Sequence, residues 1–112
     1  MIQMSPPAVN LGEFEQLVLL AVMRLEDDAY GATIKRLIEE STGRRISIGA
    51  LYTTLERLHA KGYVASHVGE PTGERGGRRR KLYTLERKGH AALSRAYASW
   101  TSMTRGLKLK LS

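Results

Sequence analysis

Seven residues at 75–81, Arg-Gly-Gly-Arg-Arg-Arg-Lys, constrain the fold of this chain more than any other feature. They lie between two short β-like runs, Tyr63–Val68 and Lys81–Leu85, which predict an antiparallel hairpin with a basic tip. Glycine lets the backbone approach another surface closely, and clustered arginines supply fork-shaped donors that match phosphate. A helix that leads directly into a basic hairpin indicates a winged helix that grips DNA.

Positive charge is concentrated in the second half of the chain. Residues 1–43 hold three basic and seven acidic side chains, whereas residues 44–112 hold fifteen basic and four acidic ones. Nucleic acid is the natural partner for such a field, and an anionic membrane surface is the rival. The longest apolar run, Leu17–Met23, is too short to span a bilayer. Without cysteine or a signal-peptide pattern, we expect a cytoplasmic protein with no membrane association.

The first expected helix is apolar on more than one stripe. It runs from a cap at Asn10 to about Leu25, with Glu13 in the capping-box position. A helix this apolar is covered on two sides, and a second copy of the chain is the simplest cover for the second side.

Two further helices should precede the hairpin. The second covers about residues 32–41 and is closed by Gly43, after which residues 44–46 form either a bridging segment or a minor strand. The third is capped by Ser47 and ends near Lys61. Its inward positions are Ile48, Leu51, Leu55 and Leu58, and its solvent-facing positions are Ser47, Gly49, Ala50, Thr53, Thr54, Arg57 and Lys61.

The outward face of the third helix is small or hydroxyl-bearing near its start, which suits insertion into the major groove. The alternative is an ordinary amphipathic helix with a polar face. Tyr52 is either buried with its hydroxyl bonded or placed to reach a phosphate. In the same way, the basic hairpin tip is either a solvated loop or a compact field for the DNA backbone. The candidate DNA-binding residues are Ser47, Gly49, Tyr52, Thr53, Arg57, Arg75, Arg78, Arg79 and Arg80.

A last helix is expected from about Glu86 to Arg105. Its apolar residues repeat at spacings of three and four, as in a coiled-coil seam. Trp100, the only tryptophan, is either an anchor in a core or dimer interface or a platform on which a flat ligand stacks. The seam residues are Leu93, Ala96, Tyr97, Trp100, Met103 and Leu107.

Nothing in the sequence supports catalysis. His59, His67 and His90 lack metal-ligand spacing, and the cysteines of the usual structural zinc sites are absent. The loop at 73–77 lacks the Gly-Lys-Ser/Thr of a nucleotide-binding loop. We therefore expect a protein that is not an enzyme and that needs no metal or cofactor.

Several motifs together resemble the PadR family of transcriptional regulators. They are Tyr30-Gly31, Leu51-Tyr52-Thr53-Thr54-Leu55-Glu56-Arg57-Leu58, Gly62-Tyr63-Val64, Gly76-Gly77-Arg78-Arg79-Arg80-Lys81-Leu82-Tyr83-Thr84-Leu85 and Gly89. The resemblance covers about residues 11–105. It implies a winged helix-turn-helix dimer that binds operator DNA, usually as a repressor, and often releases the DNA on meeting a small molecule.

The single helix after the hairpin makes the chain similar to the short subgroup of that family, in which this helix forms the dimer. Residues 97–100, Tyr-Ala-Ser-Trp, resemble the segment that places a tryptophan in a pore between the subunits of multidrug-binding members. Those members have an acidic residue one turn further on, where this chain has Thr104; Glu13 and Glu15 are candidates to replace it. The effector-binding residues implied are Trp100, Tyr97, Thr104, Glu13 and Leu17.

The sequence therefore predicts a mainly α fold with a small β-hairpin. Residues 1–9 form an N-terminal arm, residues 10–85 the winged helix-turn-helix, and residues 86–112 a dimerisation helix and tail. The expected partners are double-stranded DNA, a second copy of the chain and a small planar or cationic effector. The alternative function is a winged-helix module that binds RNA or a protein without effector control.

Overall fold

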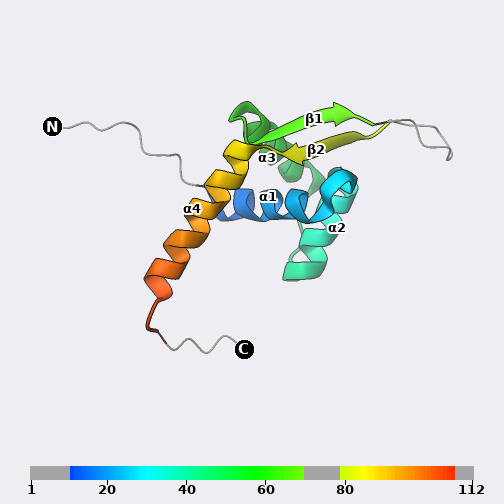
Figure 1. Cartoon of the computed structure of the whole chain (residues 1–112). Coiled ribbons are helices and arrows are strands. Elements are labelled where there is room, and N and C mark those ends of the chain that lie inside the picture. Colours follow the sequence, from blue (N-terminus) through cyan, green and yellow to red (C-terminus); the bar gives the residue numbers. More distant parts are fainter. Residues whose placement is uncertain (1–10, 70–78, 108–112) are drawn as a thin grey trace.

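The computed structural model describes residues 11–69 and 79–107 and confirms the predicted fold class. Helix α1 lies at the centre, the hairpin lies across one side of it, and the last helix extends away from the body (Figure 1). The elements are α1 (Glu13–Leu25), the short 3₁₀ helix η1 (Glu26–Asp28), α2 (Gly31–Thr42), α3 (Ile48–Ala60), β1 (Val64–Val68), β2 (Lys81–Leu85) and α4 (Arg87–Thr104).

The core is built around α1. Val18, Leu19 and Val22 are almost completely buried, and α1 contacts α2, α3, β2 and α4. Full burial of one such side chain contributes roughly 1.5–3 kcal/mol. The expectation that α1 is apolar on more than one side is also met, because Leu20 and Met23 remain exposed on this same helix.

The start of α1 differs from the prediction. Asn10 lies outside the described residues; Gly12 is the N-cap, and its N–H donates to Glu15 Oε1 at 2.9 Å. Glu15, not Glu13, therefore holds the capping-box position, because the helix begins later than its apolar pattern indicated. Lys61, which follows α3, donates to the other Glu15 oxygen, Oε2, at 3.0 Å.

This Glu15–Lys61 pair is partly buried, with Glu15 only 8% exposed. Burial alone raises the pKa of the Glu15 carboxyl, but hydrogen bonds from the Gly12 N–H and the Lys61 ammonium outweigh it, so the pKa is lowered. A carboxyl whose pKa is lowered by folding adds stability above its unfolded pKa and loses it as the pH falls through the folded value. The pair thus joins the start of α1 to the end of α3 at neutral pH.

The residues just before α2 pair with β2 and so form a third, strand-like segment beside the hairpin. Tyr30 forms an isolated antiparallel bridge with Leu82, and the Tyr83 N–H donates to the Ala29 carbonyl at 2.8 Å. The predicted minor strand at 44–46 is wrong: those residues form an extended connection, and the Ile46 N–H donates to the Glu39 carboxylate instead of to a strand. Sequence pattern alone could not show that the bridge comes from the turn before α2.

Two positions of α3, Thr54 and Ile48, differ from the prediction in whether they are buried or exposed. Leu51, Leu55 and Leu58 are fully buried as expected, but Thr54 is also buried, and Ile48 is 46% exposed. Ile46, in the connection before α3, packs against the core at this end of the helix. Because Ile46 takes the inward place, Ile48 at the first helical position faces outward.

As predicted, two glycines with positive φ lie at helix ends: Gly43 follows α2, and Gly62 lies between α3 and the hairpin. Gly43 has φ 75° and its N–H donates to the Glu39 carbonyl at 2.9 Å. Gly62 has φ 79° after α3, and the next N–H, that of Tyr63, donates to the Leu58 carbonyl. Left-handed backbone of this kind favours glycine.

Strands β1 and β2 pair antiparallel with Val64 opposite Leu85 and Val68 opposite Lys81. The end near the helices is anchored by buried Val64 and Tyr83, whereas Val68 at the far end is exposed. The hairpin is therefore fixed at its base and extends outward from the core.

Helix α4 is joined to the base of the hairpin by a close backbone contact. A Cβ placed on Gly89 would lie 2.3 Å from the Tyr63 carbonyl oxygen and 2.9 Å from Leu85 Cδ1. Gly89→Ala should therefore lower the free energy of unfolding by about 1–3 kcal/mol, because backbone must move to admit the methyl group.

The matched control is Gly49→Ala, since a Cβ at this second helical glycine meets no atom within 4 Å. It should raise stability by up to about 1 kcal/mol through helix propensity. Urea denaturation of both variants checks the contrast, and equal stabilities would contradict the close packing of Gly89.

Candidate nucleic-acid interface

The outward face of α3 has short side chains at its first turn, apart from the exposed Ile48, and longer polar ones further on. Ser47 Oγ accepts the Ala50 N–H at 3.0 Å, so this predicted DNA contact is also the helix cap. Among the described residues, none comes within 4 Å of a Cβ placed on Gly49. Thr53 and Arg57 are exposed along the same helix. This end of α3 thus offers the clear approach that a helix needs to enter a groove.

The sequence left open whether Tyr52 is buried with its hydroxyl bonded or placed to reach a phosphate, and the structure shows it partly packed and partly exposed. Its side chain is 44% exposed, yet its hydroxyl lies against the first turn of α2, where a Cβ on Gly31 would be 2.2 Å from the hydroxyl oxygen. Glycine at position 31 therefore makes room for Tyr52. The hydroxyl therefore lies beside the N-terminus of α2, at buried Gly31.

Between α2 and α3 lies an open hollow of about 400 Å³ that the sequence did not predict. Two basic residues, Lys35 and Arg36, line it from α2, and Ile48 and Tyr52 line it from α3. Lys35 also pairs with Glu39 at 3.2 Å. The alternation of charge along α2 indicated only a solvent-facing side; the proximity of this side to α3 depends on the tertiary structure.

The two described wing arginines have different surroundings. Arg79 is exposed, whereas the Arg80 guanidinium lies 4.5 Å from the centre of the Tyr30 ring. A cation–π contact at this distance fixes the outer end of β2 against the start of α2. The other predicted wing contacts, Arg75 and Arg78, lie outside the described residues.

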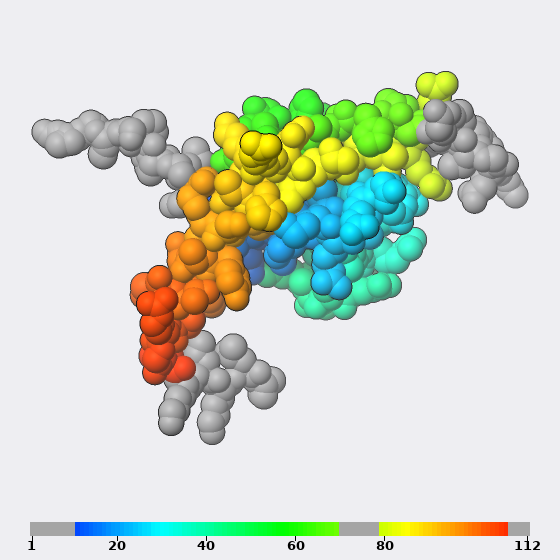
Figure 2. All heavy atoms as spheres, viewed as in Figure 1, coloured from blue at the N-terminus to red at the C-terminus, as the bar shows by residue number. Residues whose placement is uncertain are grey.

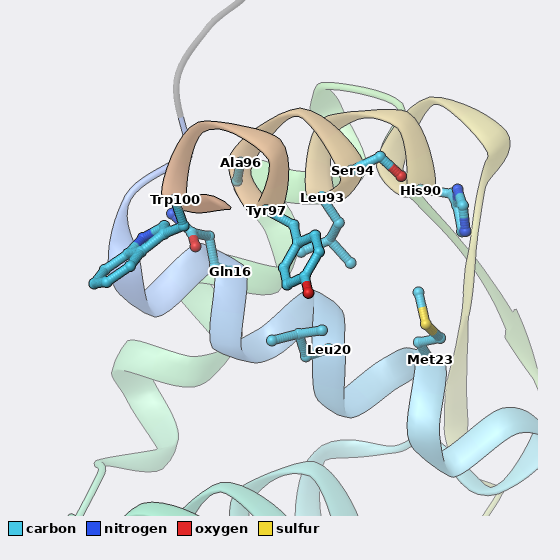
Figure 3. Close-up of a pocket in the computed structure, with 9 residues that line it drawn as sticks. All are labelled: Gln16, Leu20, Met23, His90, Leu93, Ser94, Ala96, Tyr97 and Trp100. Atoms are coloured by element: carbon cyan, nitrogen blue, oxygen red, sulfur yellow. The ribbon is translucent and has the colours of Figure 1, made fainter. Parts of the chain in front are cut away.

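A second hollow lies on the other side of the molecule, between α1 and α4. It is an open groove of about 340 Å³, into which Tyr97 and Trp100 extend from α4 above Gln16 and Leu20 of α1 (Figure 3). Tyr97 is 76% and Trp100 65% exposed. Of the predicted effector residues, the structure brings only these two together in this groove.

The remaining predicted effector residues lie elsewhere in the protomer. Glu13 is paired with Arg44 at 2.6 Å. Leu17 lines a separate groove between α1 and α2, and the Thr104 hydroxyl donates to the Trp100 carbonyl at 2.8 Å. The sequence did not single out Gln16 and Met23 as groove residues, because an apolar helix position gives no sign of which neighbour covers it.

The far half of α4 stands clear of the body of the molecule (Figure 2). Only its first turns pack on the core, through Gly89, Ala92 and Leu93, which are buried. Beyond them, Met103 and Leu107 continue the exposed apolar positions of Tyr97 and Trp100. Among the helices in the described part of the chain, none is long and apolar enough to cross a membrane.

A helix pair with a short connection, an accessible second helix and a two-stranded wing define a winged helix-turn-helix DNA-binding protein. The model of the transcriptional regulator PadR-like family matches residues 19–95. The chain therefore belongs to the PadR-like family and is a DNA-binding transcriptional regulator.

Solved structures of similar fold support this assignment. A PadR family transcription regulator from Clostridium difficile has 23% identity and a TM-score of 0.70, covering 84% of this chain and 93% of that chain. A PadR-like transcription factor from Bacteroides fragilis has 26% identity and a TM-score of 0.69, covering 81% and 82%. RosR from H. salinarum has 26% identity and a TM-score of 0.67, covering 88% and 81%. None of the curated proteins matches the chain.

The different surroundings of Arg79 and Arg80 lead to a paired prediction. Arg80→Ala should lower the free energy of unfolding by about 0.5–1 kcal/mol, because it removes the stack on Tyr30. Arg79→Ala should change stability by less than about 0.5 kcal/mol, because Arg79 is exposed. Chemical denaturation at one pH and salt concentration measures both. Equal losses in the two variants would show that the stack does not hold the wing.

Proposed function

We propose that this regulator is a homodimeric repressor that binds a pseudo-palindromic operator and releases it when a small planar or cationic molecule binds. The observation that carries the proposal is the exposed apolar face of α4, with Tyr97, Trp100 and Met103 each more than half exposed in a single copy. A face of this kind on one helix, next to exposed Leu20 and Met23 of α1, favours association with a second copy.

In this proposal α3 is the recognition helix and enters the major groove, with Ser47, Gly49, Thr53 and Arg57 nearest the DNA and Tyr52 at a phosphate. The wing arginines, at positions 75, 78, 79 and 80, hold the flanking backbone. Two copies related by a two-fold axis would read half-sites separated by about one helical turn, on the order of 10 base pairs.

The division of labour along the chain follows from the same proposal. Residues 10–85 bind DNA, and residues 86–112 form the dimerisation helix and tail. The effector would occupy the groove beneath Tyr97 and Trp100, where an indole face suits flat or cationic molecules. Thr104, Leu17 and Glu13 would complete this site in the dimer. The proposal includes no catalytic step, metal or cofactor.

Gly49→Ala separates DNA binding from folding. A methyl group at position 49 has free space in the protein, so the fold is retained, but the group would stand between α3 and a groove. We expect at least tenfold weaker binding to a duplex selected from a random pool, with unchanged or higher thermal stability. Fluorescence anisotropy with competitor RNA and competitor DNA measures this affinity. Undiminished binding would place α3 outside the interface, and preference for the RNA would favour an RNA-binding module.

Met103→Glu tests the dimer and keeps Trp100 as a probe. Because Met103 is 78% exposed in the protomer, a charge there should leave the fold intact but should be buried unpaired in the dimer. We expect sedimentation as a monomer and weaker operator binding. Ser102→Glu, at a neighbouring exposed position off the seam, is the control and should remain dimeric.

The same dimer allows a test of the effector site. Planar cationic dyes should quench the emission of Trp100 in the wild-type dimer. No change in emission across a broad dye panel would mean that the groove is closed and structural.

A further inference from the structure

Ile48 is the one exposed aliphatic side chain on the first turn of α3. It is 46% exposed, although the other large aliphatic residues of this helix, Leu51, Leu55 and Leu58, are fully buried. Ile46, two residues earlier, is partly buried and packs against the core. The core of the protomer therefore gives no reason for an isoleucine at position 48.

The neighbours of Ile48 make it the most prominent group at this end. Gly49 has no side chain, and Ala50 has only a methyl group. The Ser47 side chain is short, and its oxygen accepts the Ala50 N–H at the start of the helix. No side chain of the first turn other than Ile48 therefore reaches far from the helix, and it has no hydrogen-bonding group.

The surroundings of Ile48 are those of a surface that meets DNA. Ile48 borders the hollow between α2 and α3 together with Lys35, Arg36 and Glu39. Lys35 pairs with Glu39, whereas Arg36 is exposed and its cationic end suits a phosphate. The N-terminal residues of a recognition helix are the ones that contact base edges in the major groove. The one apolar feature that a base pair offers there is the C5-methyl group of thymine.

We propose that Ile48 is a specificity-determining residue that packs against the C5-methyl group of a thymine in each half-site. This inference rests on the proposed binding mode, in which α3 enters the major groove. It assigns base discrimination at the start of α3 to apolar contact, whereas Thr53 and Arg57 would supply polar contacts further along the helix.

Deoxyuridine substitution tests the inference, because it removes the methyl group and leaves base pairing intact. In a duplex selected from a random pool with the purified protein, each thymine is replaced in turn by deoxyuridine. At one thymine in each half-site, this replacement should lower the affinity of the wild type about fourfold, which is the contribution of one buried methyl group. Ile48→Ala removes the contact in both half-sites of the dimer, so it should bind the unmodified duplex about sixteenfold more weakly and should not respond to that replacement.

Thr53→Ala is the matched control, since it alters another exposed position of the same helix but should keep the response to the missing methyl group. A thermal melt checks that Ile48→Ala is folded, as expected for an exposed position. If the wild type binds DNA but responds to no deoxyuridine, or if Ile48→Ala responds as the wild type does, the inference is overturned and the binding mode stands. If no duplex is selected at all, both the inference and the proposed function fail.

Discussion

The burial of α1 is the constraint on which the other elements depend. Val18, Leu19 and Val22 fill the centre, and two helices, β2 and the first turns of α4 all pack on this one helix. In a chain of 112 residues no second core could substitute for it. Because α1 also keeps Leu20 and Met23 at the surface, the helix that organises the protomer is also one wall of the groove below Trp100.

The sequence was sufficient for the elements and their order. Helical periodicity, the two closing glycines and the paired β-like runs each have a local physical cause, and local causes are visible in a single sequence. What failed depended on contacts between distant segments. Ile46 and Ile48 are equally apolar, and only the tertiary structure shows that Ile46 occupies the core while Ile48 faces outward. In the same way, the edge of the hairpin is completed by Tyr30 and not by residues 44–46.

At the candidate interface, the sequence showed which residues are basic but not what each basic side chain contacts. The basic run at 75–81 reads as five equivalent charges in the sequence. In the described part of the wing, Arg80 stacks on Tyr30 while Arg79 faces solvent. An arginine within a basic run can thus hold the wing in place, and a neighbouring arginine is left free for a phosphate. Sequence spacing does not distinguish these environments, because the distinguishing partner lies about fifty residues earlier in the chain.

The ion pair between Glu15 and Lys61 has a mechanical consequence. It fastens the first turn of α1 to the end of α3, and five residues further along α1 the side chain of Leu20 forms part of the groove wall. Val18, Leu19 and Val22, between the ion pair and the far end of α1, are almost completely buried. The end of α3 and the α1 wall of the groove therefore belong to one packed unit, joined through the helix at its centre.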